Sequence, residues 1–310
     1  MYRYVLKRLL LTIPVLLGAI LLVYAIMALT PGDPGTLILG MTADKADIAA
    51  LNHELGYDKP FIVQFFDYLK NIVLRFDFGD SYRTRTPVFN EILARFPTTF
   101  ILALASMALS SIIGISLGIF SAVKQYSFVD SFFTIMAMFF AAIPGFWFGL
   151  MLMMLFSLKL GLLPSNGIDT WQCFILPTVT LSAGGAAGLM RLTRSTMLET
   201  VRQDYICTAR AKGASERAVI WKHALKNALL PVITTLGMSF GANLGGAIII
   251  ETVFGMPGLG TYIVTAIRQK DVPSVLAATI LLSVLFCLIM LIVDLLYAFI
   301  DPRIKAKYTR

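Results

Sequence analysis

The residue types that usually carry chemistry are sparse in this chain. His53 and His223 are its two histidines, and neither has companions at metal-ligand spacing, so we expect no metal site. The three cysteines, Cys173, Cys207 and Cys287, lie in segments that no disulfide would sensibly join. The sequence contains no Gly-x-x-x-x-Gly-Lys-Ser/Thr phosphate-binding loop, so the chain cannot bind ATP in that way. We therefore expect no cofactor, no catalytic residues and no enzymatic activity.

Composition narrows the class of protein. Of the 310 residues, 57% are hydrophobic and only 14% are charged, where soluble domains contain about 45–50% and about 25%. These values exclude a water-soluble enzyme and indicate an integral membrane protein. The net charge of +8 is unusual for such a protein, so the positions of the charges must be explained.

Apolar stretches of about 20 residues can cross a bilayer as helices. The sequence contains six of them, at 9–29, 98–123, 132–158, 174–192, 229–250 and 275–300. The fourth is the weakest, because it carries three glycines and ends near Arg191. The pattern predicts an all-α, polytopic membrane protein with six transmembrane helices.

The positions of lysine and arginine predict the orientation, because cytoplasmic loops are enriched in them. With a cytoplasmic N-terminus, the inner segments hold three such residues near the start, one at Lys124, eight within 191–226 and four after residue 300. These are sixteen of the 26 Lys and Arg residues, and the two short outer loops hold only three. We expect both termini in the cytoplasm and a location in the cytoplasmic (inner) membrane. Because the charge marks topology, we expect no nucleic-acid partner.

The chain is expected to have four parts. They are a transmembrane helix at 1–30, an extracytoplasmic helical cap at 31–94, a membrane core at 95–300 with a cytoplasmic loop at 193–228, and a basic cytoplasmic tail at 301–310. Within the cap, apolar spacing predicts one helix over 44–55 and a second from Pro60. The cap either packs on the outer helix ends or is a docking surface for an external partner.

The loop at 193–228 has a more specific pattern. A short helix is predicted over 200–212 and ends at Gly213, and Ser215 can begin a second helix that continues to residue 227. A stripe of small residues that looks buried accompanies them: Ala209, Ala211 and Ala214. A basic loop can simply contact anionic lipid headgroups. Two capped helices instead favour insertion into the cleft of a partner protein.

Two segments of this loop carry a resemblance to a known family. Tyr205-Ile-Cys-Thr-Ala-Arg-Ala-Lys-Gly213 and His223-Ala-Leu-Lys-Asn-Ala-Leu-Leu-Pro231 resemble the cytoplasmic signature loop of bacterial ABC-importer permeases. The chain is most similar to the first permease subunit of the dipeptide, oligopeptide and nickel branch. Further matching motifs extend over nearly the whole chain: Pro31-Gly-Asp-Pro34, Leu55-Gly-Tyr-Asp-Lys-Pro60, Gly79-Asp-Ser81, Glu251-Thr-Val-Phe254, Pro257-Gly-Leu-Gly260, Val293-Asp-Leu-Leu-Tyr297 and Asp301-Pro-Arg303.

The resemblance implies a type I ABC-importer permease fold and a subunit that forms half of the path of an ATP-driven dipeptide or oligopeptide importer. It implies a second homologous permease subunit, two ATP-binding subunits and an extracytoplasmic substrate-binding protein as partners, besides membrane lipid. The first helix of the loop would be the coupling helix that sits in a groove of an ATP-binding subunit. Its expected residues are Asp204, Ala209, Arg210, Ala211, Lys212 and Gly213. Of these, Arg210 and Lys212 can pair with acidic groups on the ATPase.

The fifth apolar stretch is rich in small and polar residues. Close helix packing explains most of its glycines. A buried amide or hydroxyl needs partners or water, so Ser239 and Asn243 are expected to line the substrate path. Glu251, at the outer end, is expected either on that path, as a gate or a contact with the binding protein, or at the interface as a hydrogen-bonded anchor. The same packing rule predicts close helix contacts at three further glycine pairs, Gly114/Gly118, Gly145/Gly149 and Gly184/Gly188.

Other classes of protein remain as alternatives. An ion-coupled secondary transporter would carry paired charges near the bilayer midplane and broken helices, which only Gly184 and Gly185 suggest here. A membrane-embedded enzyme would need clustered catalytic groups, whereas Asp294 is the one acid expected within a span. The sequence does not select the substrate: dipeptides, longer peptides, a glutathione-like thiol and a nickel chelate all remain open, because selectivity in the resembled family resides largely in the binding protein.

Overall fold

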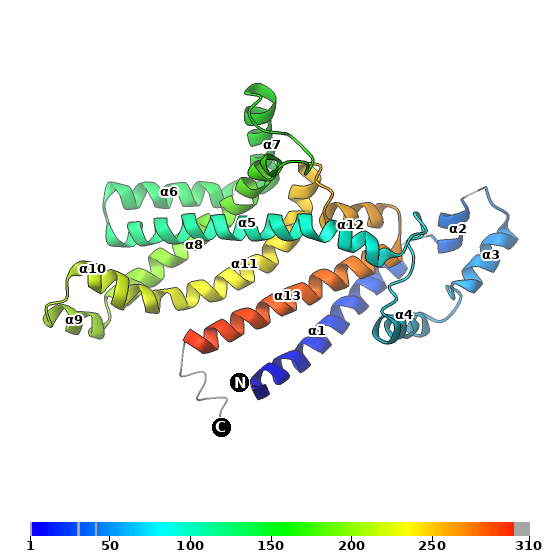
Figure 1. Ribbon diagram of the computed structural model, residues 1–310, viewed down its shortest axis with the longest axis horizontal. Coiled ribbons are helices and arrows are strands. Elements are labelled where there is room, and N and C mark those ends of the chain that lie inside the picture. The colour runs from blue at the N-terminus through cyan, green and yellow to red at the C-terminus, as the bar shows by residue number, and fades with distance from the viewer. Residues whose placement is uncertain (1, 30–31, 41, 301–310) are drawn as a thin grey trace. The chain divides into compact units, whose positions relative to one another are not determined.

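The regular structure of the chain is helical (Figure 1). The computed structural model describes residues 2–29, 32–40 and 42–300, and within these ranges the only β-type pairing is an isolated bridge between Asp80 and Pro87. The all-α prediction is confirmed. The predicted basic tail 301–310 and the side chain of Asp294 lie outside what is described.

Five helices are long and apolar enough to cross a membrane in the described part of the chain, and a bent helix pair makes up to six. The five spans lie in α1 (Tyr2–Leu29), α5 (Val88–Val123), α8 (Ile175–Val201), the helix that leads into α11 (Leu225–Val253), and α13 (Val272–Ile300). α5 begins ten residues earlier than predicted. Its 36 residues extend about 54 Å at 1.5 Å per residue, so its first turns continue beyond a hydrocarbon core about 30 Å thick.

The third predicted span is not one continuous helix. α6 (Phe128–Ala142) and α7 (Gly145–Leu152) meet at a bend of 100°, and α7 continues as a π-helical turn over Met153–Lys159. Pro144 explains the break, because proline lacks an N–H and disfavours the helical conformation in the residue before it. Ile143 is accordingly extended, with ψ 129°. The expectation of an uninterrupted helix over 132–158 was wrong at this proline.

The chain forms two compact units, each of which is described by itself. The first is built on Phe100–Met256 and includes α13 from Leu288 onward, and the second combines Val5–Thr99 with Pro257–Cys287. The second unit contains a helix that was not predicted, α12 (Leu259–Arg268). Its buried residues recur with helical spacing at Leu259, Ile263 and Ala266, which is the sequence signal that could have revealed it.

In the first unit, α5 and α8 approach closely at glycines. A Cβ atom on Gly114 would lie 2.7 Å from the carbonyl oxygen of Ala186, and one on Gly118 would lie 2.6 Å from Cβ of Thr193. Neither position can therefore hold a side chain without moving the helices apart. The predicted close contact is confirmed for this pair.

The other two predicted glycine pairs behave differently. Gly149 is in contact, since its Cβ would lie 3.1 Å from both Phe254 and Thr180. No described atom lies within 4 Å of a Cβ built on Gly145, Gly184 or Gly188. Within the described chain, close packing is therefore found at Gly149 but not at Gly145, Gly184 or Gly188.

In the second unit, three helices follow α1: α2 (Pro34–Leu39), α3 (Lys45–Glu54) and α4 (Phe61–Arg75). α3 and α4 confirm the helices predicted over 44–55 and from Pro60, whereas α2 was not predicted. α4 packs its buried Phe65 against Ile20 of α1 and Ile280 of α13.

Candidate functional site

The predicted pair of helices in the basic loop, residues 193–228, is present with shifted boundaries. α8 extends to Val201, so the next helix, α9 (Asp204–Ala211), begins four residues later than expected. Gly213 then adopts a left-handed φ of 82°, and Ser215 begins the second helix by accepting a hydrogen bond from Ala218 N at 3.4 Å. That helix is longer than predicted and consists of α10 (Glu216–Ala218), a π-helical turn (Val219–Ala224) and α11.

One aliphatic side chain anchors α9. Ile206 is completely buried and packs in one cluster with Met197 of α8 and with the π-helical turn. The predicted small stripe is not the buried face, because Ala211 is exposed while Ala209 and Ala214 are only half-buried. This expectation was wrong because a large aliphatic side chain removes more surface from water than an alanine does.

The charges of the loop are partly used within the loop itself. Arg210 donates to Glu216 through Nε at 2.7 Å and through Nη2 at 3.2 Å, which joins the two sides of the turn at Gly213. No acidic residue of the described chain pairs with Lys212, which is exposed. Asp204 is also exposed and occupies the first turn of α9, where a negative charge suits the helix dipole.

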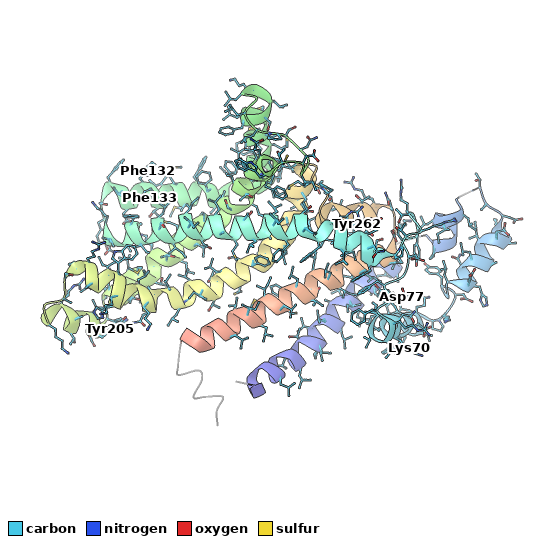
Figure 2. All side chains as sticks on the ribbon, in the orientation of Figure 1. Lys70, Asp77, Phe132, Phe133, Tyr205 and Tyr262 are labelled. Atoms are coloured by element: carbon cyan, nitrogen blue, oxygen red, sulfur yellow. The ribbon has the colours of Figure 1, made fainter. Side chains whose placement is uncertain are left out.

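A side-chain hydrogen bond connects α9 to α11. Asn227, in the first turn of α11, donates to the hydroxyl of Tyr205 at 2.8 Å, at the end of the unit where Figure 2 labels Tyr205. Together with the buried contact of Ile206, this bond holds α9 against two long helices.

A buried ion pair that the sequence analysis missed lies near the same end of the unit. Arg194 of α8 donates to both carboxylate oxygens of Asp130, Nε to Oδ1 at 2.6 Å and Nη2 to Oδ2 at 2.7 Å. Asp130 also accepts from Ser121 Oγ and, at 3.0 Å, from Tyr126 N. The pair joins the end of α5, the first turn of α6 and α8. A lone acid just after the N-cap Ser127 was the available sequence signal.

The expected path residues lie on α11 in different surroundings. Ser239 and Asn243, one turn apart, are half-buried. They lie beside an exposed stripe with helical spacing, Met238, Ala242, Gly245 and Ile249. Glu251 is completely buried and therefore does not face an open path in this conformation.

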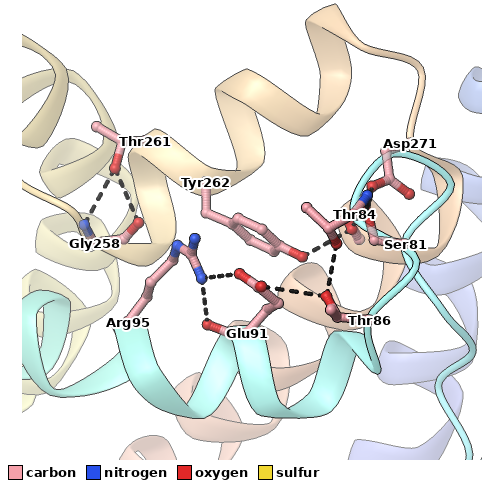
Figure 3. Close-up of polar contacts among 10 residues, drawn as sticks. Ser81, Thr84, Thr86, Glu91, Arg95, Gly258, Thr261, Tyr262 and Asp271 are labelled. Atoms are coloured by element: carbon pink, nitrogen blue, oxygen red, sulfur yellow. Dashed lines mark hydrogen bonds and ion pairs between the residues drawn. The ribbon is translucent and has the colours of Figure 1, made fainter.

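In the second unit, Asp271 organises a polar cluster that joins the motif at 79–81 to the start of α13 (Figure 3). Its carboxylate accepts hydrogen bonds from Ser81 Oγ, from Tyr82 N at 3.2 Å and from Ser274 Oγ at 2.8 Å. The hydroxyl of Tyr262 in turn donates to Ser274 at 2.8 Å. Ser81, Asp271 and Ser274 are at most 4% exposed. This buried and well-satisfied network therefore holds the backbone at residues 81–82 against the start of α13.

Arg95 extends that network to the start of α5 (Figure 3). It forms an ion pair with Glu91 one turn earlier, and its guanidinium lies 4.6 Å from the centre of the Tyr262 ring. Such a cation–π contact stabilises the arrangement by about 0.5–2 kcal/mol. The cluster is a packed polar network in which the carboxylate of Asp271 is held by three donors.

No group of three or more His, Cys, Asp and Glu that could hold a metal ion occurs among the described residues. The long apolar helices define a polytopic helical membrane protein, and α9 of its basic loop is held against α8 and α11 by the contacts of Ile206 and Tyr205. The chain belongs to the family of binding-protein-dependent transport system inner membrane components: the model for this family matches residues 114–306, and the model for its N-terminal membrane component matches residues 1–103. The predicted membership among inner-membrane permeases of ABC importers is confirmed.

Curated relatives match along their full length. The chain is 44% identical over 307 residues to a protein of Pectobacterium atrosepticum and to one of Salmonella typhimurium, both named glutathione transport system permease protein GsiC. The protein of that name from Escherichia coli K12 is 43% identical over 307 residues. Each match covers 99% of this chain and 100% of the relative.

Solved structures share the fold. Two crystal forms of the inward-facing MetNI methionine ABC transporter match with TM-scores of 0.57 and 0.56, at 19% and 18% identity. Each match covers 68% of this chain and 96% of the solved chain. The type I ABC-importer permease fold is thereby confirmed.

Proposed function

We propose that this chain is a permease subunit of an ATP-driven importer of short peptides, and that glutathione is its substrate. The observation that carries the proposal is the 44% identity, over 99% of the chain, to permeases named for glutathione transport. Glutathione is itself a tripeptide, so it falls within the peptide class that the signature loop predicts. Membership of a binding-protein-dependent transport family leaves no reason to retain the ion-coupled alternative.

The complete importer is proposed to contain a second homologous permease subunit, two ATP-binding subunits and an extracytoplasmic substrate-binding protein. The exposed stripe of α11 supports the second permease subunit, because its two central residues, Ala242 and Gly245, are small and allow another helix to approach closely in a membrane. This chain would then supply half of the path. It would hydrolyse no ATP alone, since it has no phosphate-binding loop.

α9 and the turn at Gly213 are proposed to sit in a groove of an ATP-binding subunit. The contact residues would be Asp204, Ala209, Arg210, Ala211, Lys212 and Gly213. Lys212 has the clearest role, because its ammonium group is free of acids in the described chain, whereas Arg210 already holds Glu216. Closure of the ATPases would move α9, and the contacts of Tyr205 and Ile206 would carry this movement to α11 and α8 as rigid bodies.

Ser239 and Asn243 are proposed to line the path from α11, on the border of its exposed stripe. Glu251 would act at the end of that helix as an enclosed anchor that becomes accessible only when the path changes conformation. Cysteines placed at 239 and 243 should react with a thiol reagent to an extent that depends on the nucleotide state. Equal protection in every state would indicate simple packing.

The sixteen inward lysines and arginines support an arrangement with both termini in the cytoplasm. The proposed parts are the helix at 1–30, the extracytoplasmic segment at 31–94, the permease core at 95–300 with the coupling loop at 193–228, and the tail at 301–310.

Uptake into proteoliposomes tests this function. The chain is purified with the second permease, the ATPases and the binding protein encoded beside it, and labelled glutathione and a labelled dipeptide are supplied in turn. We expect ATP-dependent uptake of glutathione that requires the binding protein. ATP-dependent uptake of the dipeptide but not of glutathione would show that the proposed substrate is wrong. Uptake that needs an ion gradient but no ATP would contradict the proposal of an ATP-driven importer.

A further inference from the structure

One side of α4 carries large apolar side chains that the second unit does not cover. Ile62, Phe66 and Val73 are 65%, 61% and 71% exposed, and their spacing places them on one side of the helix. Side chains of this size are less favourable in water than in an apolar environment. This side of α4 is therefore more stable against an apolar environment than in water.

The other sides of α4 either pack against the protein or carry polar residues. Phe65 and Ile72 point to the protein, where they pack in a cluster with Ile20 of α1 and Ile280 of α13. A polar side carries Gln64, Asp67 and Asn71. At 3.6 residues per turn, this polar side lies opposite the exposed apolar side.

The contacts of α4 with α1 and α13 show how far α4 lies from the ends of these two membrane-spanning helices. Tyr24, whose ring touches the rings of Phe61 and Phe65, lies about 7 Å from the Leu29 end of α1 at 1.5 Å per residue. Ile20 lies about 13 Å from that end, and Ile280 lies about 12 Å from the start of α13. α4 therefore crosses the two spans below their ends, at a depth typical of helices that lie in the membrane interface.

The two free sides of α4 differ in direction along those spans. Gln64 donates to the backbone carbonyls of Tyr57 and Lys59, and the hydroxyl of Tyr57 donates to the carbonyl of Gly32, beyond the end of α1. A cavity of about 180 Å³ on the same side is lined by Asn71 and by residues from the start of α13. The polar side thus faces the ends of the spans, and the exposed apolar side must face toward their middle.

We infer that α4 is an in-plane interfacial helix, and that the acyl chains of one leaflet cover Ile62, Phe66 and Val73. This leaflet is the outer one if the orientation proposed above holds, but the inference itself rests only on the spans. Lys70, labelled beside α4 in Figure 2, is exposed between the two sides and can extend its ammonium group to the headgroups. The segment 31–94 then lies partly within the membrane, through α4, rather than wholly in water.

Two neighbouring residues provide a matched test. Val73 and Leu74 are both aliphatic and are 71% and 70% exposed, but Val73 lies on the apolar side and Leu74 lies about 100° away, toward the polar side. Val73→Cys and Leu74→Cys are made in the full chain after Cys173, Cys207 and Cys287 have been replaced by serine. Each is labelled with a nitroxide in the assembled transporter in lipid nanodiscs. The accessibility of the label to oxygen, which concentrates in lipid, is compared with its accessibility to a water-soluble nickel chelate.

We expect the label at 73 to have a several-fold higher ratio of oxygen to chelate accessibility than the label at 74, and a label at 66 to behave like that at 73. Equal, water-like ratios at 66, 73 and 74 would overturn the inference by placing α4 outside the bilayer. Protection at 66 and 73 from both reagents, appearing only when the binding protein is added, would also overturn it in favour of a protein partner. Transport activity of the same variants is measured separately, so loss of the proposed function does not affect this outcome.

Discussion

Arg194 and Asp130 form a two-point ion pair between α8 and the first turn of α6, with donor–acceptor distances of 2.6 and 2.7 Å. The Asp130 side chain is 5% exposed, so it is enclosed by protein and depends on its donors. The basic loop follows directly from α8. The pair therefore connects the proposed coupling element to α6, outside the helices that form the loop.

Arg194→Ala is expected to destabilise the first unit by about 3 kcal/mol, because it leaves an enclosed carboxylate without its main partner. Asp130→Asn combined with Arg194→Gln removes both charges and should cost less than Arg194→Ala alone. Thermal unfolding of the purified protein measures both effects. If the double variant lost as much stability as Asp130→Asn and Arg194→Gln lose when each is made singly and the two losses are added, the two side chains would not be coupled.

Gly213→Ala should disturb the turn after α9 through the backbone alone. Gly213 has φ 82°, and no described atom lies within 4 Å of a Cβ built there, so the cost comes from the left-handed conformation and is about 1–2 kcal/mol. We expect lower ATP-driven uptake for Gly213→Ala. Gly213→Asn is the matched control, because asparagine adopts this conformation more readily and should retain most activity. Equal activity of the two variants would indicate that the turn does not matter for coupling.

Lys212→Glu is expected to weaken binding of the ATP-binding subunit more than Glu216→Ala does. The second change frees Arg210 from an exposed pair worth at most about 1 kcal/mol, whereas the first reverses a charge that is available to a partner. Co-purification of the ATPase at increasing salt measures the difference. Indistinguishable retention of the ATPase by both variants would remove Lys212 from the proposed contact.

Asp33 is expected to make the segment 31–94 sensitive to acid. The hydrogen bond from Asn52 Nδ2 at 2.7 Å, aided by the N–H and hydroxyl of Thr36, lowers the pKa of Asp33 below its ordinary value. A lowered folded-state pKa means that the stabilisation is fully present above the unfolded pKa, near 4, and is lost as pH falls through the folded value.

The thermal stability of the natural protein should therefore exceed that of Asp33→Asn by a constant amount above about pH 5, and this difference should shrink below about pH 4. Unfolding temperatures measured from pH 7 to pH 3 check this expectation. A difference that stayed constant over the whole range would show that the charge of Asp33 does not stabilise the segment.

Local patterns in the sequence predicted the local structure well. The helices α3 and α4, the turn at Gly213 and the cap at Ser215 all follow from a few neighbouring residues. Periodicity alone overlooked Pro144, although proline is a local signal. The choice of buried face on α9 failed because an alanine stripe does not reveal which helix lies opposite it, whereas the structure places Met197 beside Ile206.

Contacts between distant segments could not be predicted in the same way. Asp130 and Arg194 are 64 residues apart, and Ser81 and Asp271 are 190 apart. Each acid is unremarkable in its own segment, and its role depends on how the helices pack. The network at Asp271 gives a physical reason why the motif at 79–81 and the segment at 268–271 occur in one chain.

The central claim is that the loop at 193–228 couples this permease to an ATPase, and the most direct measurement is site-specific cross-linking in cells. A photo-reactive benzoylphenylalanine replaces Lys212, and in a control it replaces Lys45 in the segment 31–94, in the tagged protein with its partners present. We expect mass spectrometry to identify an ATP-binding subunit joined to position 212 and not to position 45. A cross-link from 212 to lipid alone, with no ATP-binding subunit captured while transport remains active, would contradict it.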